Sequence, residues 1–529
     1  MIFVIRVVRR GGIDRQAYRR VTCSRRRECM PRPHPRTKGR SMRPRAGNDP
    51  RNMTVKLLSG RDGPEPDDET ISLAVDQIAV TLPTLRGFGT ALSTLERSTS
   101  IDLAVAYDPY CIRNAGAALD DNQLNFDLKR LGFARGRPGI GCPAAVHLER
   151  CAAPARVVVV DSPQMTMLGG LGMLTIVASA QQLVESIATG RLDWQTPEII
   201  QIILSGRLTA AVVARDVSLE LVRLGLRELV QSVIAARQAQ VVLEFTGPGT
   251  RGLSVSERAM LCSMAPSVGA AAAIAACDEK TELFLRDQRR SKANRQLSPD
   301  PGAPCAEVLC LDLSTVVPLV ALHAQGIVPV AEVAGSPIRE VIIGGECSAT
   351  LRDLLTAAAW FKTKRTAADV DVMIVPATRQ VFECIANNGT LTQLLSVGVR
   401  LLEPDARLLE GHWHPPPCDG ISLRSFAQSG NAATGPINWA LGSVDTLSMS
   451  AIAGTLQDPR ATRKSQRVTS PRQLPIDDSL LFDRRPANST TLAPPKPTSD
   501  SFSTNAPIPK TYADGALGKR VLGERQAWS

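Results

Sequence analysis

The stretch from Arg156 to Leu174, RVVVVDSPQMTMLGGLGML, decides the fold class. Its four consecutive valines are typical of a strand buried on both faces, as the strands of parallel sheets are. The glycines at 169, 170 and 172 predict a tight turn, and the apolar residues from Met173 onward predict a helix. A strand, a Gly-rich turn and a helix in this order predict a βαβ unit.

The same alternation continues across residues 53–455. Short β-branched runs at 241–245, 341–343 and 370–375 predict strands, and residues 351–361 predict a helix. The Ile-rich run after Thr196 and Pro197 fits either a helix start or a strand. Repeated strand, turn and helix segments predict an α/β fold with mainly parallel sheets in three-layer α/β/α domains.

Composition divides the 529 residues into five parts. We predict a basic leader at 1–52, two α/β/α domains at 53–285, a charged linker at 286–304 and a third domain at 305–455. The remainder, 456–529, is rich in Pro, Ser, Thr and Arg and predicts a disordered tail.

Positive charge is concentrated in the leader, where residues 1–51 contain 16 Lys/Arg and only three acidic residues. The whole chain has a net charge of +11, so its body is slightly acidic. The leader fits a mis-assigned start before Met53, a mitochondrial transit peptide or a phosphate-binding arm. Nucleic acid is the weakest of these three interpretations, because the leader has no interleaved aromatic residues.

The cysteine pattern indicates a reducing compartment. The twelve cysteines are scattered and form no CxxC pair, which is unlike a disulfide-stapled secreted protein. No apolar stretch of eighteen residues predicts a membrane span. We therefore expect a cytoplasmic or mitochondrial protein without a membrane partner.

Eight motifs resemble those of the large subunits of the aconitase and isopropylmalate dehydratase family, and they occur in the family's order. They are HLERCAAP at 147–154, LGGLGML at 168–174, EFTGPG at 244–249, LSVSER at 253–258, DEKT at 278–281, LDLS at 311–314, VPATRQV at 375–381 and SAIAG at 450–454. The resemblance implies three α/β/α domains around a cleft. It also implies a separate swivelling domain, supplied by a small-subunit partner, that this chain does not contain.

The family's reaction removes water from a hydroxy-di- or tricarboxylate and adds it back at the neighbouring carbon. The resemblance implies a [4Fe–4S] cluster, held by three cysteines, whose open iron acts as the Lewis acid. Only the first cysteine has a counterpart, Cys347, in a strand-to-helix turn that would favour a thiolate. Ala406 and Leu409 stand at the other two positions, so we expect the cluster to be absent or held by atypical ligands.

Several other side chains come into question as such ligands. Cys384 and Cys418 are isolated in the sequence, and His412 and His414 lie beside a run of prolines that predicts a surface turn. Imidazole replaces thiolate in some iron–sulfur clusters, which makes the histidines conceivable ligands.

The acid–base groups implied by the resemblance are also depleted. Asp108 keeps the carboxylate of one motif and is the candidate catalytic residue, although a turn-capping role fits it too. Ala144 and Gln164 replace family histidines, whereas His147 is expected to be structural. Arg424 is the candidate for binding a substrate carboxylate.

Three functions follow from this comparison. The first is a hydro-lyase acting on an isopropylmalate-like acid in leucine-type chain elongation, for primary or specialised metabolism. The second is a catalytically inactive pseudoenzyme that serves as a scaffold or regulator, which the site chemistry favours. Nucleic-acid binding through the leader is the third.

Overall fold

The computed structural model describes residues 50–59, 70–89, 91–110, 117–323, 325–362, 364–409, 417, 419–427, 438–462, 468–469, 471 and 474–483. Most of the leader, His412, His414, Cys418 and the tail beyond residue 483 lie outside this description. Within it, no helix is both long and apolar enough to cross a membrane.

The first sheet has five parallel strands in the order β4-β3-β2-β5-β6. They are β2 (Gln77–Thr81), β3 (Leu103–Tyr107), β4 (Ala134–Arg135), β5 (Val157–Val160) and β6 (Leu174–Val177). Val157 and Val159 of β5 pack into one apolar cluster, and Val158 and Val160 pack into another. The valine run is therefore buried on both faces, as its sequence predicted.

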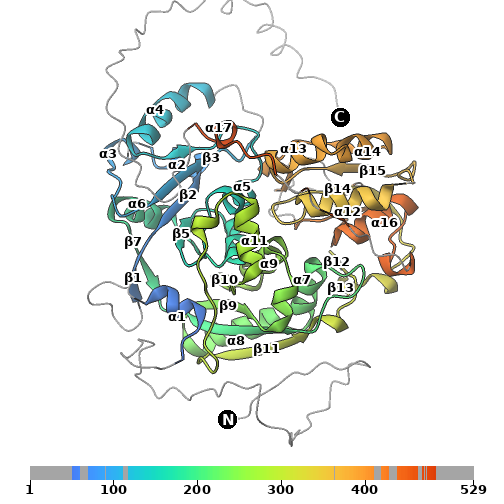
Figure 1. Cartoon of the computed structure of the whole chain (residues 1–529), viewed down its shortest axis with the longest axis horizontal. Coiled ribbons are helices and arrows are strands. Elements are labelled where there is room, and N and C mark those ends of the chain that lie inside the picture. The colour runs from blue at the N-terminus through green and yellow to red at the C-terminus, as the bar shows by residue number, and fades with distance from the viewer. Residues whose placement is uncertain are drawn as a thin grey trace, which may run out of the picture. The chain divides into compact units, whose positions relative to one another are not determined.

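Helical segments and a separate two-stranded antiparallel sheet belong to the same part of the chain as this sheet (Figure 1). The helices are α1 (Met53–Leu58), α2 (Leu82–Gly87), α3 (Ala91–Thr94), α4 (Ala117–Arg130), α5 (Pro143–Arg150), the 3₁₀ helix η1 (Pro163–Leu171) and α6 (Ala180–Thr189). Strands β1 (Thr70–Ala74) and β7 (Arg191–Gln195) pair with each other in antiparallel orientation.

The second sheet has four parallel strands in the order β10-β9-β8-β11. They are β8 (Glu198–Ser205), β9 (Val241–Thr246), β10 (Ala272–Ala275) and β11 (Glu307–Asp312). Its helical segments are α7 (Ala214–Arg223), α8 (Leu226–Arg237), η2 (Pro248–Gly252), α9 (Val255–Cys262), α10 (Ala265–Val268), α11 (Glu279–Asp287) and η3 (Ser291–Ala293). The Ile-rich run after Pro197 is thus a strand.

The third sheet has seven strands in the order β13-β12-β18-β17-β14-β15-β16, of which the last five pair in parallel. The strands are β12 (Leu319–Leu322), β13 (Gly326–Pro329), β14 (Ile338–Ile343), β15 (Asp371–Ile374), β16 (Arg400–Leu401), β17 (Ile421–Arg424) and β18 (Trp439–Gly442). The helical segments that follow β11 along the chain are η4 (Leu313–Thr315), η5 (Val330–Glu332), α12 (Leu351–Phe361), α13 (Arg379–Asn387), α14 (Thr390–Ser396), α15 (Ala406–Leu409), α16 (Val444–Ala453), η6 (Pro459–Thr462) and α17 (Asp478–Leu481). The predicted α/β class with mainly parallel sheets is confirmed.

Glycines join η1 to the second sheet. A methyl group on Gly169 would lie 1.9 Å from the carbonyl oxygen of Ala273, and one on Gly170 would lie 2.2 Å from the nitrogen of Ala259. The prediction of a helix from Met173 is wrong, because this turn leads directly into β6. Close backbone packing therefore explains these glycines better than anion binding at a helix N-terminus.

The segment predicted to be a linker, 286–304, packs against the body. Leu297 is buried, and the buried Arg290 donates to the carbonyl oxygen of Ala152. Asp300 forms a 2.6 Å ion pair with Lys56. Arg290 and Asp300 thus find partners far away in the sequence, which local composition does not reveal.

Two other predicted boundaries also shift. The leader was expected to end at residue 52, but Asn52 is buried and its side chain caps α1 by accepting from the Val55 N–H. At the other end, part of the predicted tail is ordered: α17 and the buried Phe482 pack against the first sheet. Gly136 and Phe482 form an antiparallel bridge there.

Candidate functional site

A cleft of about 930 Å³ is lined by residues associated with all three sheets. Its walls include Glu149 of α5, Met167 of η1, Arg215 of α7 and the turn at 346–353. The start of α9, parts of α11 and α13, and residues 442–445 complete the lining. A ligand in this cleft would touch segments that lie far apart in the sequence, as family resemblance predicted.

Cys347 lies in this cleft, on the turn between β14 and α12. Its thiol contacts the sulfur of Met167 at 3.6 Å. Burial, followed by the nearby Glu346, raises the pKa of Cys347 to about 12. Without a bound metal, desolvation outweighs the favourable backbone groups of the turn and favours the neutral thiol, whereas the role of Cys347 as a ligand stays a prediction.

The segment that replaces the family's two-cysteine loop lies beside the end of β3. The backbone N–H of Ala406 donates to the carbonyl oxygen of Pro109 at 2.9 Å. Arg407 forms an ion pair with Asp405 at 2.7 Å, and its guanidinium lies 4.9 Å from the centre of the Tyr110 ring. An ion pair and an aromatic contact thus occupy the described part of this loop.

Asp108 directly follows β3 and is 6% exposed. Its Oδ1 accepts a hydrogen bond from the backbone N–H of Tyr110 at 3.2 Å, which is the contact of an Asx turn. Asp108 is not among the residues that line the cleft. Its turn role has direct support, and its catalytic role stays a prediction.

Arg424 does not face the cleft. It lies in β17, is 0% exposed and forms a 3.1 Å ion pair with Glu340. Its Nε donates to the Ser422 hydroxyl at 2.8 Å. Because its guanidinium is committed to partners inside the sheet, Arg424 is not placed to make the predicted contact with a substrate carboxylate.

The model of the aconitase family (aconitate hydratase) matches residues 115–416, which is more than half of the chain. The chain belongs to the aconitase family. It is 30% identical to the 3-isopropylmalate dehydratase large subunit 1 of Methanopyrus kandleri, over 58% of this chain and 72% of that protein. It is 28% identical to the homoaconitase large subunit of Thermus thermophilus, over 66% of this chain and 83% of that protein.

Among solved structures, the chain has a weak likeness to the holo-form of Thermococcus kodakaraensis aconitase X. Its sequence is 10% identical, and it covers 68% of this chain and 84% of its own with a TM-score of 0.37. This likeness is too remote to bear on the site.

The described residues of this aconitase-family chain do not fit a cluster held by three cysteines. Ala406 and Leu409 carry no ligand atom, so Cys347 is the one thiol at the three matched positions. No group of three His, Cys, Asp or Glu side chains suited to a metal occurs in the part of the chain that the structure describes. Cys384 lines the cleft, but burial raises its pKa to about 11.

His147 is structural, as its sequence context predicted. It is fully buried, with Nδ1 2.9 Å from the Tyr107 hydroxyl and Nε2 3.0 Å from the Gln77 side-chain oxygen. Burial, followed by the charge of Arg290, lowers its pKa to about 3. A neutral imidazole with both nitrogens engaged does not serve as a proton donor in the cleft.

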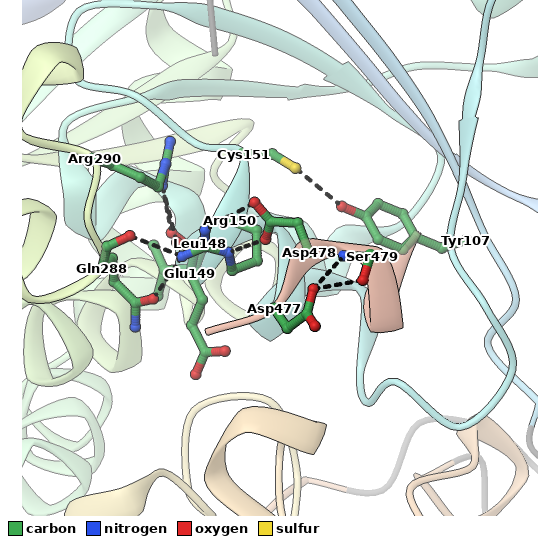
Figure 2. Close-up of polar contacts among 10 residues, drawn as sticks. All are labelled: Tyr107, Leu148, Glu149, Arg150, Cys151, Gln288, Arg290, Asp477, Asp478 and Ser479. Atoms are coloured by element: carbon green, nitrogen blue, oxygen red, sulfur yellow. Dashed lines mark hydrogen bonds and ion pairs between the residues drawn. The ribbon is translucent and has the colours of Figure 1, made fainter. Parts of the chain in front are cut away.

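Glu149 is a candidate acid–base group that the sequence reasoning missed. It lines the cleft, and its Oε1 accepts from the Thr378 hydroxyl at 3.2 Å. Burial raises its pKa to about 7, against the smaller lowering effects of Thr378 and Arg150. Figure 2 shows its side chain extending away from the neighbouring Arg150–Asp478 ion pair. Its position in the family-like motif that begins HLER, at 147–150, was the sequence signal that could have identified Glu149.

Arg215 is a second residue that the sequence reasoning missed. It is the second residue of α7, and its Nη2 donates at 2.9 Å both to the Ser348 hydroxyl and to the carbonyl oxygen of Ser425. Burial lowers the pKa of this guanidinium, although the nearby acidic groups oppose the change. A cation and a carboxyl group with a near-neutral pKa therefore line one cleft.

Proposed function

We propose that this protein is a hydro-lyase of the large-subunit type that acts on a hydroxy-di- or tricarboxylate of the isopropylmalate class. The substrate would bind in the cleft and undergo removal and re-addition of water. Membership of the aconitase family and the names of the relatives support the reaction class. Leucine-type chain elongation, in primary or specialised metabolism, is the setting that such a substrate implies.

The observation that carries this proposal is the near-neutral pKa of Glu149 at the cleft wall. Dehydration breaks a C–O bond and the neighbouring C–H bond, and hydroxide leaves carbon poorly. The Glu149 carboxylate would therefore take the proton from carbon and deliver it to the departing hydroxyl, which leaves as water. A carboxyl with a pKa of about 7 is protonated often enough to give that proton and basic enough to take it back. In the hydration direction, the same carboxylate would remove a proton from the attacking water.

A small-subunit partner belongs to this proposal. Several relatives are named large subunits, including a homoaconitase large subunit from Thermus thermophilus and a 3-isopropylmalate dehydratase large subunit 2 from Archaeoglobus fulgidus. A partner that covers the cleft would exclude water and add groups to the substrate site.

A second candidate function is a non-catalytic scaffold or regulator that binds the same acid. It is favoured by one observation: the matched cysteine positions supply a single thiol, Cys347, because Ala406 and Leu409 stand at the other two. Without a Lewis acid, the activation of the leaving group depends entirely on proton transfer. The two candidates share a ligand and differ in turnover.

The test combines the purified chain, a small-subunit homologue and isopropylmalate, and follows the unsaturated product by ultraviolet absorbance. We expect turnover that falls roughly 100-fold or more in Glu149→Gln, because the amide neither gives nor takes the proton. Saturable binding without product would establish the scaffold instead. Turnover that survives Glu149→Gln would contradict the role given to this carboxyl group.

Anaerobic incubation with iron and sulfide tests the cofactor separately. We expect no broad iron–sulfur absorbance in the visible range from this donor set. A stable signal with three or more irons per chain would show that other ligands hold a cluster. The leaving group would then be activated by a Lewis acid and not by proton transfer from Glu149.

A further inference from the structure

The guanidinium of Arg215 is incompletely used inside the protein. Both of its hydrogen bonds to described residues come from Nη2. Its Nε is shielded from solvent and has no hydrogen-bond partner, and no described acidic group forms an ion pair with it. A buried guanidinium normally has a carboxylate partner, because desolvating an uncompensated charge is costly.

The nearest carboxyl in the sequence does not serve as that partner. Asp216 accepts from the backbone N–H groups of Val213 at 2.9 Å and Leu319 at 3.0 Å. Those contacts hold the start of α7 against β12. Asp353 likewise accepts from the backbone and hydroxyl of Thr350, where it completes the capping box of α12. Both carboxyl groups are committed to backbone contacts near Arg215.

The other cations of the cleft are used differently. Arg352 is 58% exposed at its side chain and pairs with Glu257 at 3.3 Å. Arg207 and Lys280 are exposed to solvent. Among the described cations that line the cleft, Arg215 alone combines partial burial with the lack of an acidic partner.

Ser348 adds a second group to this position. Its hydroxyl oxygen accepts from Arg215, which leaves its own proton available to another acceptor. Ser348 is 4% exposed and also lines the cleft. A guanidinium and a hydroxyl side by side offer two donors to one planar anion, which is the pattern that recognises a carboxylate.

We propose that Arg215 and Ser348 form a carboxylate-binding subsite that anchors one end of the acid bound in the cleft. This inference rests on the proposed function for the identity of the ligand and names the residues that recognise it. Arg215 is here a binding residue, not a proton-transfer group. Asp216, Asp353 and Glu346 act on Arg215 through space but form no described ion pair with it, so the ligand's carboxylate would be its direct anionic partner.

The test measures isopropylmalate binding by titration calorimetry to the full chain and three variants. We expect Arg215→Met to raise Kd roughly 10- to 100-fold, as loss of a charged hydrogen-bond pair does. Arg215→Lys keeps the positive charge but loses the planar set of N–H donors. Its Kd should therefore lie between those of the unmodified chain and Arg215→Met. Arg400→Met is the control, because Arg400 lies outside the cleft lining in an exposed ion pair with Asp371, and its Kd should stay within about twofold.

A ligand analogue separates recognition from structural damage. Replacing one carboxylate of the ligand by a carboxamide should weaken binding to the unmodified chain by a similar factor and should barely affect Arg215→Met. Ser348→Ala should show the same reduced discrimination between the two ligands. These comparisons hold even where a substitution lowers the melting temperature, because each variant is compared with itself.

The outcomes distinguish this subsite from the proposed function. Equal affinities for the unmodified chain and Arg215→Met, or equal sensitivity of both to the carboxamide, would overturn the subsite and leave the hydro-lyase intact. If the acid binds in a way that depends on Arg215 but no product forms, the subsite would be supported and the hydro-lyase function would be contradicted. Failure of the unmodified chain to bind the acid would overturn both.

Discussion

Arg150 of α5 grips Asp478 of α17 through two hydrogen bonds, Nε to Oδ1 at 2.7 Å and Nη2 to Oδ2 at 3.1 Å (Figure 2). The same guanidinium donates to the backbone and side-chain oxygens of Gln288. Residues separated by more than 300 positions are thereby tied together beside the cleft, which Leu474 helps to line. The end of the described chain is thus part of the folded body.

We predict that Asp478→Asn lowers the free energy of unfolding by roughly 1–3 kcal/mol, because Arg150 keeps its buried charge and loses its partner. Urea denaturation, with an unchanged m-value, measures this loss. Asp371→Asn is the matched control, since Asp371 pairs with Arg400 at an exposed site and should contribute less than about 0.5 kcal/mol. Equal losses in the two variants would contradict the structural role of α17.

Gly170→Ala should destabilise the fold by about 3 kcal/mol. The added methyl would lie 2.2 Å from the backbone nitrogen of Ala259, and neither η1 nor α9 can withdraw without opening the joint between two sheets. Thermal melting measures the effect. Gly87→Ala provides the comparison, because nothing lies within 4 Å of the corresponding position there. A melting temperature unchanged by Gly170→Ala would show that the joint is loose.

Glu149 should make stability fall as pH rises. Its folded-state pKa of about 7 lies above the ordinary value of 4.5, so the folded chain holds a proton that the unfolded chain has released. This contribution is complete below about pH 4.5 and is lost as pH rises through about 7. Other buried carboxyls titrate in the same range, so the informative quantity is the difference between the unmodified chain and Glu149→Gln.

We predict that the free energy of unfolding falls less for Glu149→Gln than for the unmodified chain as the pH rises from 5 to 8. Urea denaturation midpoints at each pH measure this difference. Glu185→Gln, at an exposed position of α6, is the matched substitution. Parallel pH curves for the unmodified chain and Glu149→Gln would show that this carboxyl does not titrate across the predicted range.

Cys347 should react slowly with iodoacetamide. With a pKa of about 12, only a minute fraction is thiolate at pH 8, and the thiolate is the reacting species. Peptide mass spectrometry should show alkylation at least about 100-fold slower than at the exposed Cys310. Rapid labelling of Cys347 in the folded chain would reveal an accessible thiolate and reopen the question of metal ligation.

The sequence alone determined the α/β class and the family, because both depend on local patterns. The valines of β5 and the residues of α12 follow from burial periodicity and turn chemistry. Six of the eight ordered motifs contribute residues to the cleft lining. The loss of two ligand positions, Ala406 and Leu409, could also be read directly from the residues.

Tertiary structure decided which of the remaining groups face the cleft and in what charge state. Arg424 has the right chemistry for a carboxylate but is held inside a sheet by Glu340, whereas Arg215, unremarked in the sequence, reaches the cleft wall without an acidic partner. Cys347 and Glu149 owe their raised pKa values to burial by segments far away in the chain. Desolvation and ion pairing depend on three-dimensional neighbours, and a linear pattern does not contain them.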